Sequence, residues 1–494
     1  MNYCLRYLAP LLGGIAWLLS PALAIPASVE NTPPVKSSTD QRVRLTERED
    51  ENRVLQPWTI QFMGHPLTAT LQYELAADWI RQLSENDPPH GKTRVLLEQQ
   101  AEVEVFYTLG TRLSFLAQAR VKMEKDLRSD SPRGVSDVFV ERGEMWVNSE
   151  QVFGLPLSIE IGRLDFEDDR RWWWDEDLDA VRVTLAGQSM ELALAVAEEL
   201  GPTRTDRRFI DPAREDVRRV IAEATWDWDT DHTLQLFALH HTDRSPTPKM
   251  GEIIDLQRED ETDAKFTWWG VRATGGWEVP SGGILRYWVD TARVRGDERA
   301  VNFLPLSKHQ SVVNERVQRD VDGWAYDLGV TWTAPFNFDP RFTLGYARGS
   351  GDKGENDLRD RAFRQTGLNG NAPGFGGVQS FQGYGMLLDP ELSNLAILTV
   401  GVGWSLYSSS SLDLVYHAYR QIEPTHSLRH ARLETVLTGR DRNLGHGFDL
   451  VLAVEESDWV EFEVTASAFR AGEAFGPQRG EWTFGGFAAI RLAF

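Results

Sequence analysis

The final stretch of the chain, from Glu481 to Phe494, alternates between an apolar face and a more polar one. Alternation of this kind places successive side chains on opposite faces of a β-strand. A strand of about ten residues with aromatic side chains near both ends fits the wall of an outer-membrane barrel, and an edge strand of a soluble β-sandwich is the alternative. The apolar face would hold Trp482, Phe484, Gly486, Ala488, Ile490, Leu492 and Phe494.

The same alternation returns many times upstream. Between Leu113 and Met123, for example, apolar residues at odd positions alternate with polar residues at most even positions. Such patterns predict about eighteen strands, an even number, as in bacterial outer-membrane barrels. Only the segment 190–196 also fits a helix, because it is rich in Ala, Leu and Glu. The predicted strands cover residues 71–79, 95–107, 113–124, 136–148, 156–164, 180–186, 190–196, 217–228, 232–241, 264–273, 284–294, 323–333, 341–348, 395–403, 412–420, 448–454, 459–470 and 481–494.

The predicted connections alternate in length. Short links, such as 109–111, 187–188 and 229–231, alternate with long polar stretches. A soluble sandwich has no reason to segregate loop length to one side, whereas an outer-membrane barrel has short periplasmic turns and long extracellular loops. We therefore predict an all-β fold, a transmembrane antiparallel up-and-down β-barrel, over residues 67–494, with a long extracellular loop at 350–393. The other predicted long loops are 198–216, 244–262, 296–321 and 422–446.

The N-terminus indicates export. Arg6 precedes an apolar run from Leu11 to Leu19, and Ala22 to Ala24 offers a small-residue cleavage site, so residues 1–24 read as a secretory signal peptide. The single cysteine, Cys4, lies inside this segment, which leaves no disulfide or cysteine metal site after cleavage. Residues 25–66 read as a periplasmic leader or a short plug segment. The expected location is the bacterial outer membrane, crossed many times.

Several classes of function fit the sequence poorly. With 52 basic and 74 acidic residues, the chain has a net charge of −22, and phosphate binding by a nucleic-acid partner needs basic surface. No zinc-protease motif, phosphate loop or nucleophile elbow is present, so we expect neither an enzyme nor a cofactor. One acidic run could bind a divalent cation that bridges lipopolysaccharide, although such runs are more often solvated loops. It consists of Glu259, Asp260, Glu261 and Asp263.

Basic residues fall on the predicted lumen side of the early strands despite the acidic composition. Arginines in a pore concentrate anions. Alternatively, each could pair with a lumen acid such as Glu98, Glu102, Glu144 or Asp165 and stiffen the wall. The residues concerned are Arg94, Arg112, Arg120 and Lys122, with Arg142, Arg163, Arg170, Arg171 and Arg348 close to the loops.

The chain resembles the alginate export barrels of Gram-negative outer membranes. The resemblance is densest in motifs 345–351, 365–368, 391–395, 414–417, 449–451 and 472–477, and it continues more loosely upstream through Trp146-Val147, Gly162-Arg163 and Trp174-Asp175. It implies a monomeric barrel that passes a linear polyuronate. It also implies cationic pore roles for Arg142, Arg163 and Arg348, with Asp175 as their acidic partner.

Two features of the sequence depart from that resemblance. Arg348 follows Phe342 and Leu344 on the outward face, so it would need a β-bulge or a position above the lipid to reach the pore. Glu74 and Glu463 stand where the best-known family members carry inward basic residues, and the link 455–458 is too short to form the periplasmic plug found in them.

Three hypotheses follow from the sequence. The first is passive export of an anionic exopolysaccharide, alginate or a relative, with lipopolysaccharide, outer-membrane lipid, the barrel-assembly machinery and periplasmic secretion proteins as partners. The second is a general or substrate-specific porin for small anions. The third is a structural or adhesive barrel that displays the loop from Ser350 to Leu392.

Overall fold

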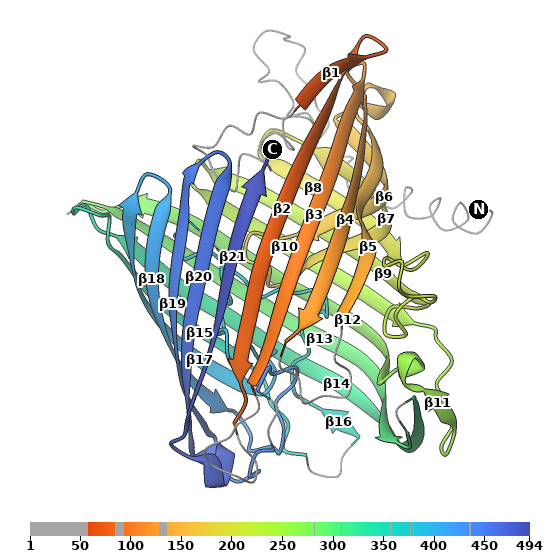
Figure 1. Ribbon diagram of the computed structural model, residues 1–494, viewed down its shortest axis with the longest axis vertical. Helices are drawn as coiled ribbons and strands as arrows, with labels where there is room; N and C mark the ends of the chain where they lie inside the picture. Colours follow the sequence, from red (N-terminus) through yellow and green to blue (C-terminus); the bar gives the residue numbers. More distant parts are fainter. Residues whose placement is uncertain are drawn as a thin grey trace. The chain divides into compact units, whose positions relative to one another are not determined.

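Eighteen strands close into an antiparallel barrel in the computed structural model (Figure 1). The structure describes residues 58–83, 93–127, 136–280, 282–307, 309–354, 358–375, 377–378, 380–433 and 436–494. All of them belong to one of the two units of the chain, Ser37–Phe494. The predicted signal peptide and the leader up to residue 57 lie outside the described residues. Within the described part, no helix has the length and hydropathy of a membrane span.

Each barrel strand pairs with its neighbours in the barrel, and β2 pairs with β21 to close the ring, from Gln72 opposite Ala493 to Ile80 opposite Gly485. The strands are β2 (His65–Arg81), β3 (Thr93–Leu109), β4 (Leu113–Asp126), β5 (Ser136–Ser149), β6 (Leu157–Glu167), β7 (Asp175–Ala186), β8 (Met190–Glu198), β9 (Val217–Asp229), β10 (His232–Asp243), β12 (Thr262–Glu278), β13 (Ile284–Pro305), β14 (Gln310–Thr333), β15 (Arg341–Gly349), β17 (Leu395–Tyr407), β18 (Ser410–Gln421), β19 (Asn443–Ser457), β20 (Val460–Ala471) and β21 (Trp482–Ala493).

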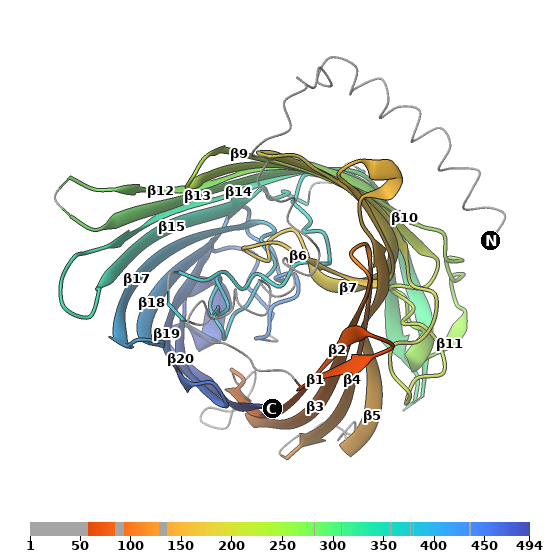
Figure 2. The same ribbon diagram turned by 90° about the horizontal axis from the view of Figure 1, so that it is seen from above.

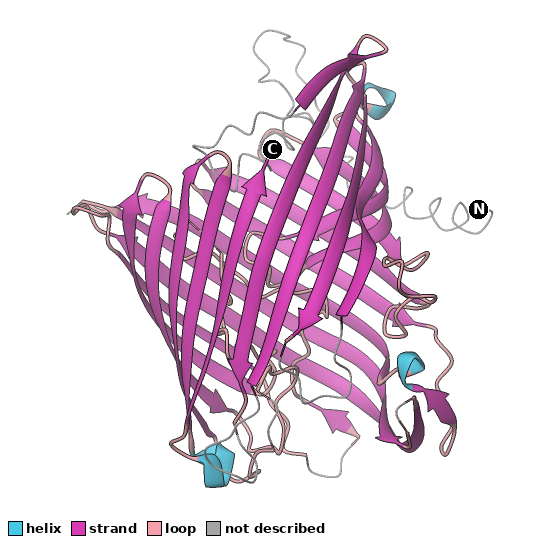
Figure 3. Cartoon of the chain, viewed as in Figure 1, coloured by secondary structure: helices cyan, strands magenta, loops and turns pink. Residues whose placement is uncertain are grey.

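Three short strands lie beside the ring. β1 (Trp58–Phe62) pairs with β2, β11 (Ile253–Asp255) pairs with β14, and β16 (Arg359–Asp360) pairs in parallel with β14. Three short 3-10 helices complete the described elements, namely η1 (Val152–Gly154), η2 (Leu256–Arg258) and η3 (Glu473–Gln478) (Figure 3).

The two ends of the barrel differ, as the connection lengths predict. Short connections such as 110–112, 230–231 and 458–459 lie at the same end as the C-terminus, which we call the turn end. The long connections 199–216, 350–394 and 422–442 lie at the other end, the loop end. One predicted loop was wrong. Residues 296–321 were expected to form a loop, but β13 and β14 remain paired as far as Pro305 and Ser311. Polar residues outside the lipid need no apolar alternation, so the pattern hides the extension.

The outer face of the wall is apolar, as expected for the closing strand. In β21, Trp482 and Phe484 are exposed, while Thr483 between them is buried on the inside. In β15, Phe342 and Leu344 are exposed in the same way. The inside of the ring is not empty, because two chain segments enter it (Figure 2).

The first segment is the hairpin of β6 and β7 with the turn 168–174, which we call the crossing hairpin. β6 pairs with β5 only from Ile159 to Arg163, beside Ser149 to Met145. The bend lies at Gly162, whose φ of +144° suits glycine, and a Cβ there would lie 2.1 Å from the carbonyl oxygen of Met145. Beyond the bend, residues 203–205 take the vacated place beside β5 through two backbone hydrogen bonds of 2.9 and 3.0 Å. The hairpin itself turns into the lumen (Figure 2).

The second segment is the connection 350–394, which we call the inner loop. It was expected to lie outside the barrel at the extracellular face. Instead, Leu388 and Leu392 are almost fully buried, and Phe375 and Phe381 pack in a cluster with Trp288 of β13. The amide of Val378 donates to Ser411 at the start of β18, which places this part of the loop near the turn end. The loop therefore runs down the inside of the barrel and returns. Its apolar residues lack any strand period, so the sequence pattern did not predict this packing.

Candidate functional site: a charged lumen wall facing a packed one

The inner faces of β2 to β5, β20 and β21 form what we call the charged wall. Its side chains alternate inward with the outward apolar residues, and they are partly exposed although they point into the barrel. Side-chain exposure is 23% for Arg120, 22% for Glu141 and 33% for Arg491. Exposure inside a closed ring means that these groups border water-accessible space, as in porins.

The structure brings three of the predicted pore arginines together at this wall. Arg120 of β4 lies 2.7 Å from Glu102 and 3.7 Å from Asp177. Arg163 lies 4.0 Å from the same Asp177. Arg142 lies 2.8 Å from Asp179. The acidic partners Asp177 and Asp179 belong to β7, so the crossing hairpin and the charged wall meet through alternating charges.

These arginines do not form a bare cationic ring. Arg120 is shared between acids of three strands, and Lys122 lies 3.2 Å from Glu141. The alternative in which arginines pair with lumen acids therefore describes these contacts, and Glu102 is one of the acids named for it. An arginine that the sequence analysis overlooked, Arg182, pairs with Glu160 at 2.6 Å. The alternation of side chains along β7 places Arg182 on the inward face, and this pattern could have identified it from the sequence.

Near the turn end, acids surround a second overlooked arginine. Arg491 of β21 lies 2.5 Å from Glu74, 3.6 Å from Glu461 and 3.7 Å from Glu463. Three carboxylates around one guanidinium leave a local negative excess. Glu74 and Glu463, noted in the sequence as unexpected acids, thus meet at one place.

The other predicted pore residues lie elsewhere. Arg94 is exposed and 3.6 Å from Asp126, towards the loop end. Arg112 is exposed in the turn before β4, at the opposite end. Asp175 lies 3.6 Å from Arg171 and, through its backbone amide, 2.5 Å from the carbonyl oxygen of Leu368 in the inner loop. Within the described residues, its ion pair is therefore with Arg171, and not with Arg142 or Arg163.

Arg348 lies on the outer wall. β15 has no register shift against either neighbour, so no bulge turns this side chain inward. Arg348 is paired with Tyr326 across the strands, and its guanidinium carbon lies 5.7 Å from the ring centroid of Trp324, which is exposed. The parity argument placed it correctly, and the pore role implied by the resemblance does not fit this position. An arginine above aromatic rings suits the interfacial girdle of a barrel.

The opposite side of the lumen, which we call the packed wall, comprises the inner faces of β13 to β15 and β17 to β19. Many of its inward residues are small, and the inner loop covers them. A Cβ on Gly329 would lie 2.2 Å from the ring of Trp288, so only glycine admits that indole. The inward small residues include Gly329, Thr331, Thr343, Gly345, Thr399 and Gly401.

A buried ionic cluster ties the crossing hairpin to this side. Arg170 in its turn donates to Asp290 of β13 at 2.9 Å and to Asp327 of β14 at 3.1 Å. Arg272 of β12, fully buried, donates to Asp290 at 2.5 Å and contacts Asp168 of the turn. The carboxylate of Asp168 also accepts backbone amides of the tryptophan run 172–174. Buried charges persist only when paired in this way.

The same cluster holds the inner loop. Tyr384 donates its hydroxyl proton to Asp327 at 3.1 Å and accepts from Trp172 at 2.7 Å. Trp288 also donates to Asp327, at 2.8 Å. Hairpin, loop and wall therefore meet at one carboxylate. Sequence reasoning missed the cluster because its members lie on five separate segments whose registers were unknown.

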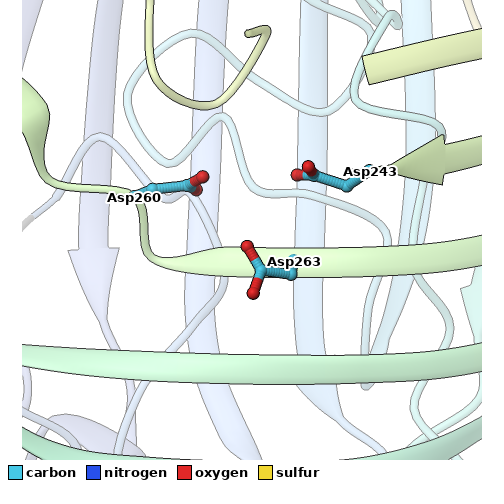
Figure 4. Close-up of side chains that lie close together, drawn as sticks. All are labelled: Asp243, Asp260 and Asp263. Carbon is cyan, nitrogen blue, oxygen red and sulfur yellow. The ribbon is translucent and has the colours of Figure 1, made fainter. Parts of the chain in front are cut away.

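Two residues of the acidic run proposed as a cation site, Asp260 and Asp263, lie close together in the structure. Oxygens of Asp243, Asp260 and Asp263 lie within 4.8 Å of one another at the loop end of β10 and β12 (Figure 4). Glu259 and Glu261 are not part of this group in the described chain. The hydroxyl oxygen of Ser245 lies 2.7 to 3.2 Å from all three carboxylates. Burial, with the nearby charges of Asp243 and Asp263, raises the pKa of Asp260 to about 7.

A cavity of about 1070 Å³ opens at the loop end, between the inner loop and the wall strands β9, β10 and β12. The connection 199–216 contributes residues 206–214 to its lining, and the connection 422–442 contributes Arg429 and His430. Charged side chains of both signs face it. This cavity, the charged wall and the ionic cluster are the polar features of the lumen.

Comparisons with known proteins give relatives and a fold. A family model described as alginate export matches residues 40–483. The alginate production protein AlgE of Pseudomonas aeruginosa is 26% identical over 353 residues, which cover 68% of this chain and 70% of that protein. AlgE of Azotobacter vinelandii is 25% identical over 294 residues, covering 57% of this chain and 58% of its own length.

Solved structures of other proteins share the fold. Acinetobacter baumannii OccAB1 has a TM-score of 0.57 at 10% identity, and the match covers 87% of this chain and 96% of that one. Pseudomonas aeruginosa OccK5 has a TM-score of 0.52 at 10% identity, covering 86% and 98%. At this identity the likeness concerns the fold alone.

Proposed function

Because this chain belongs to the alginate export family, we propose that it is the channel through which an anionic polysaccharide, alginate or a related polyuronate, crosses the outer membrane. The family match over residues 40–483 carries the proposal. The protein is an outer-membrane barrel, and its turn end then faces the periplasm, since short turns lie on that side in such barrels. Periplasmic secretion proteins would deliver the polymer, and lipopolysaccharide would meet the outer wall.

The charged wall supports a path for the polymer. Arg120, Arg142 and Arg163 are each held beside a carboxylate, so a uronate arriving there exchanges one carboxylate partner for another. Such exchange keeps each contact weak, which a conducting path requires, because binding must favour entry without preventing release. The inner loop occupies the other side of the lumen and the crossing hairpin lies between the two walls, which confines a passing polymer to the space beside the charged wall.

A secretion assay tests the proposal. The wild-type chain is expressed in a bacterium that synthesises alginate but lacks its own export barrel, and secreted uronate is measured. We expect secretion to be restored and then largely lost when Arg120→Glu and Arg163→Glu are combined. Arg348→Glu is the matched control, because it reverses a charge on the outer wall near an interface, where the cost to a barrel is about 0–1 kcal/mol. Heat-dependent mobility on gels verifies assembly of each variant.

A second candidate function is a porin for small solutes. The observation that favours it is the acid excess around Arg491, where Glu74, Glu461 and Glu463 converge. A long polyanion would meet repulsion there, whereas small ions pass by exchange with water. If the assembled wild-type barrel restores no uronate secretion but conducts small ions in a planar bilayer, the porin replaces the export channel.

A further inference from the structure

The cavity at the loop end contains a buried arginine whose guanidinium forms no ion pair among the described residues. Arg219 of β9 points inward and is only 5% exposed. Its Nε and Nη1 atoms have no hydrogen-bond partner, and no ion pair of its guanidinium occurs among the described residues. A buried charge without a partner is costly. The side chain lines the cavity, so a ligand in the cavity could supply the missing acceptor.

A second orphan donor lies directly opposite Arg219. His241 of β10 is its cross-strand partner in the β9–β10 pair, so the two side chains are neighbours on the lumen face. The Nδ1 atom of His241 is also buried without a hydrogen-bond partner. His241 lines the same cavity, and its ring meets that of Trp268 edge to face at 6.2 Å. A guanidinium fork and an imidazole nitrogen side by side match the oxygens of a carboxylate.

The acids nearest to Arg219 are already engaged. Arg214 contacts Glu176 and lies 3.8 Å from Glu199. Asp243, two residues beyond His241 on the same face, accepts both the amide and the hydroxyl of Ser245, at 2.8 and 2.7 Å. These acids act on Arg219 from beyond ion-pair distance, so its guanidinium keeps room for a further anion.

Two other arginines of the cavity differ in this respect. Arg364 pairs with Asp360 at 2.5 Å and with Glu298 at 3.3 Å. Arg429 pairs with the same Glu298 at 3.1 Å. Since their charges are met within the protein, they shape the electrostatics of the cavity without demanding a ligand. Of the two buried arginines that line the cavity, Arg219 and Arg364, Arg219 is therefore the one left for an incoming anion.

We propose that Arg219 and His241 form a carboxylate-binding subsite in the loop-end cavity, and that its ligand is the carboxylate of a uronate unit. The choice of a polymeric ligand rests on the export function proposed above, whereas the subsite itself rests on the two orphan donors. A volume of about 1070 Å³ admits more than one sugar unit, since ligand pockets span roughly 300–1,000 Å³. The subsite would hold the polymer near its exit from the barrel.

Calorimetric titration of the purified full-length barrel in detergent tests the subsite. The probes are tetramannuronate, glucuronate and an uncharged mannose tetramer. We expect the uronates to bind and the neutral tetramer not to bind. Arg219→Gln should weaken uronate binding about 10- to 100-fold, the range for one hydrogen bond to a charged group. Arg219→Lys, which keeps the charge but loses the fork, should fall between the two.

The matched control is Arg218→Gln. Arg218 is the adjacent residue on the opposite face of β9, and it pairs with Glu198 at 3.1 Å. The Arg218→Gln variant should bind uronates as tightly as the wild type does. If Arg219→Gln does not assemble, His241→Gln and Arg219→Lys still test the same donors, because each retains part of the site.

The outcomes separate the subsite from export. Unchanged uronate binding in Arg219→Gln, or equal binding of the neutral tetramer, overturns the subsite whatever the secretion assay gives. Binding that depends on Arg219 but is as tight for glucuronate as for the tetramer supports the subsite and counts against a polymeric ligand. Binding that depends on Arg219 and is tighter for the tetramer supports both.

Discussion

The charged wall and the packed wall belong to one continuous sheet, yet they treat their inward side chains in opposite ways. On the charged wall, Arg120 and Glu141 remain partly exposed and pair across strands. On the packed wall, Gly329 and Thr343 are buried beneath the inner loop. Small inward residues occur on the side of the lumen where the inner loop packs. Long charged residues occur on the side that borders water. Fold alone does not distinguish the two, because both outer faces carry the same apolar band.

The largest expected effect comes from removing the cover of the packed wall. Replacing residues 352–391 by a short Gly-Ser link should raise single-channel conductance severalfold, because a barrel of 16–18 strands without internal chain holds an aqueous channel. Planar-bilayer recording measures it. A link of the same kind replacing residues 248–250, in the connection between β10 and β11, is the control. Unchanged conductance after the longer deletion would mean that the inner loop does not limit the open area.

The next effect concerns the ionic cluster. Arg170→Met removes a cation shared by Asp290 and Asp327, and breaking a buried pair costs about 3–5 kcal/mol. We expect the amides of residues 168–174 to lose protection in hydrogen exchange by this order of free energy. Arg171→Met is the control. Arg171 is adjacent to Arg170 in the chain, but it is partly exposed and pairs with Glu167 at 2.8 Å. Equal protection in both variants would show that the cluster does not fix the hairpin.

A smaller effect is expected at the turn end of the charged wall. Glu461→Gln with Glu463→Gln removes two of the three acids around Arg491. Anion permeability relative to cations should rise by about twofold for each charge, because a unit charge some 8 Å away in water is worth about 0.5 kcal/mol. Reversal potentials in a salt gradient report it. Glu456→Gln, at the exposed turn end of β19, should leave selectivity unchanged.

The smallest effect is a pH dependence at the base of the inner loop. His430 lies 3.2 Å from Glu391, and this hydrogen bond raises the pKa of His430. Burial raises the pKa of Glu391, but His430 and Arg429 more than offset it, so that pKa is lowered. A raised histidine pKa gives a stabilisation that is complete below the unfolded pKa of about 6.5 and is lost as pH rises through the folded pKa.

Hydrogen exchange at Gln365 measures this contribution, because its amide donates to Glu391 at 2.6 Å. The protection factor in the wild type should exceed that in His430→Gln at low pH, and the difference should vanish at high pH. Comparison at each pH cancels the intrinsic dependence of exchange and the effects of Arg429 and Glu261, which act on both proteins. A constant difference would exclude titration of His430 as its cause.

The fold was readily predicted from the sequence because alternation and turn length are local properties. All eighteen predicted strands exist, including 190–196, where a helix was the alternative. The errors arose where local pattern gives no information. The extension of β13 and β14 is polar, and the inner loop has no period. Both are fixed by contacts with distant segments.

The candidate site was predicted in part for the same reason. Inward parity found Arg120, and it placed Arg348 outside where the family resemblance implied the pore. The cross-strand pairing of Arg219 with His241 could have been predicted from the sequence, because the tight turn at 230–231 fixes the register of β9 and β10 apart from one bulge. The cluster of Arg170, Asp290 and Asp327 was not, because it depends on a hairpin that leaves the wall.

The inner loop begins at the end of β15 and returns to the start of β17, and these two strands are hydrogen-bonded to each other from Arg341 opposite Gly403 to Gly349 opposite Leu395. The loop therefore leaves the barrel wall and returns to it between two strands that are direct neighbours. Its withdrawal through the open mouth breaks the short pairing of β16 with β14 but leaves the pairing of β15 with β17 intact. The lumen can therefore be emptied while the ring stays closed, provided that the side-chain contacts of the loop and its backbone hydrogen bonds, such as those of residues 358, 368 and 388, are exchanged for water.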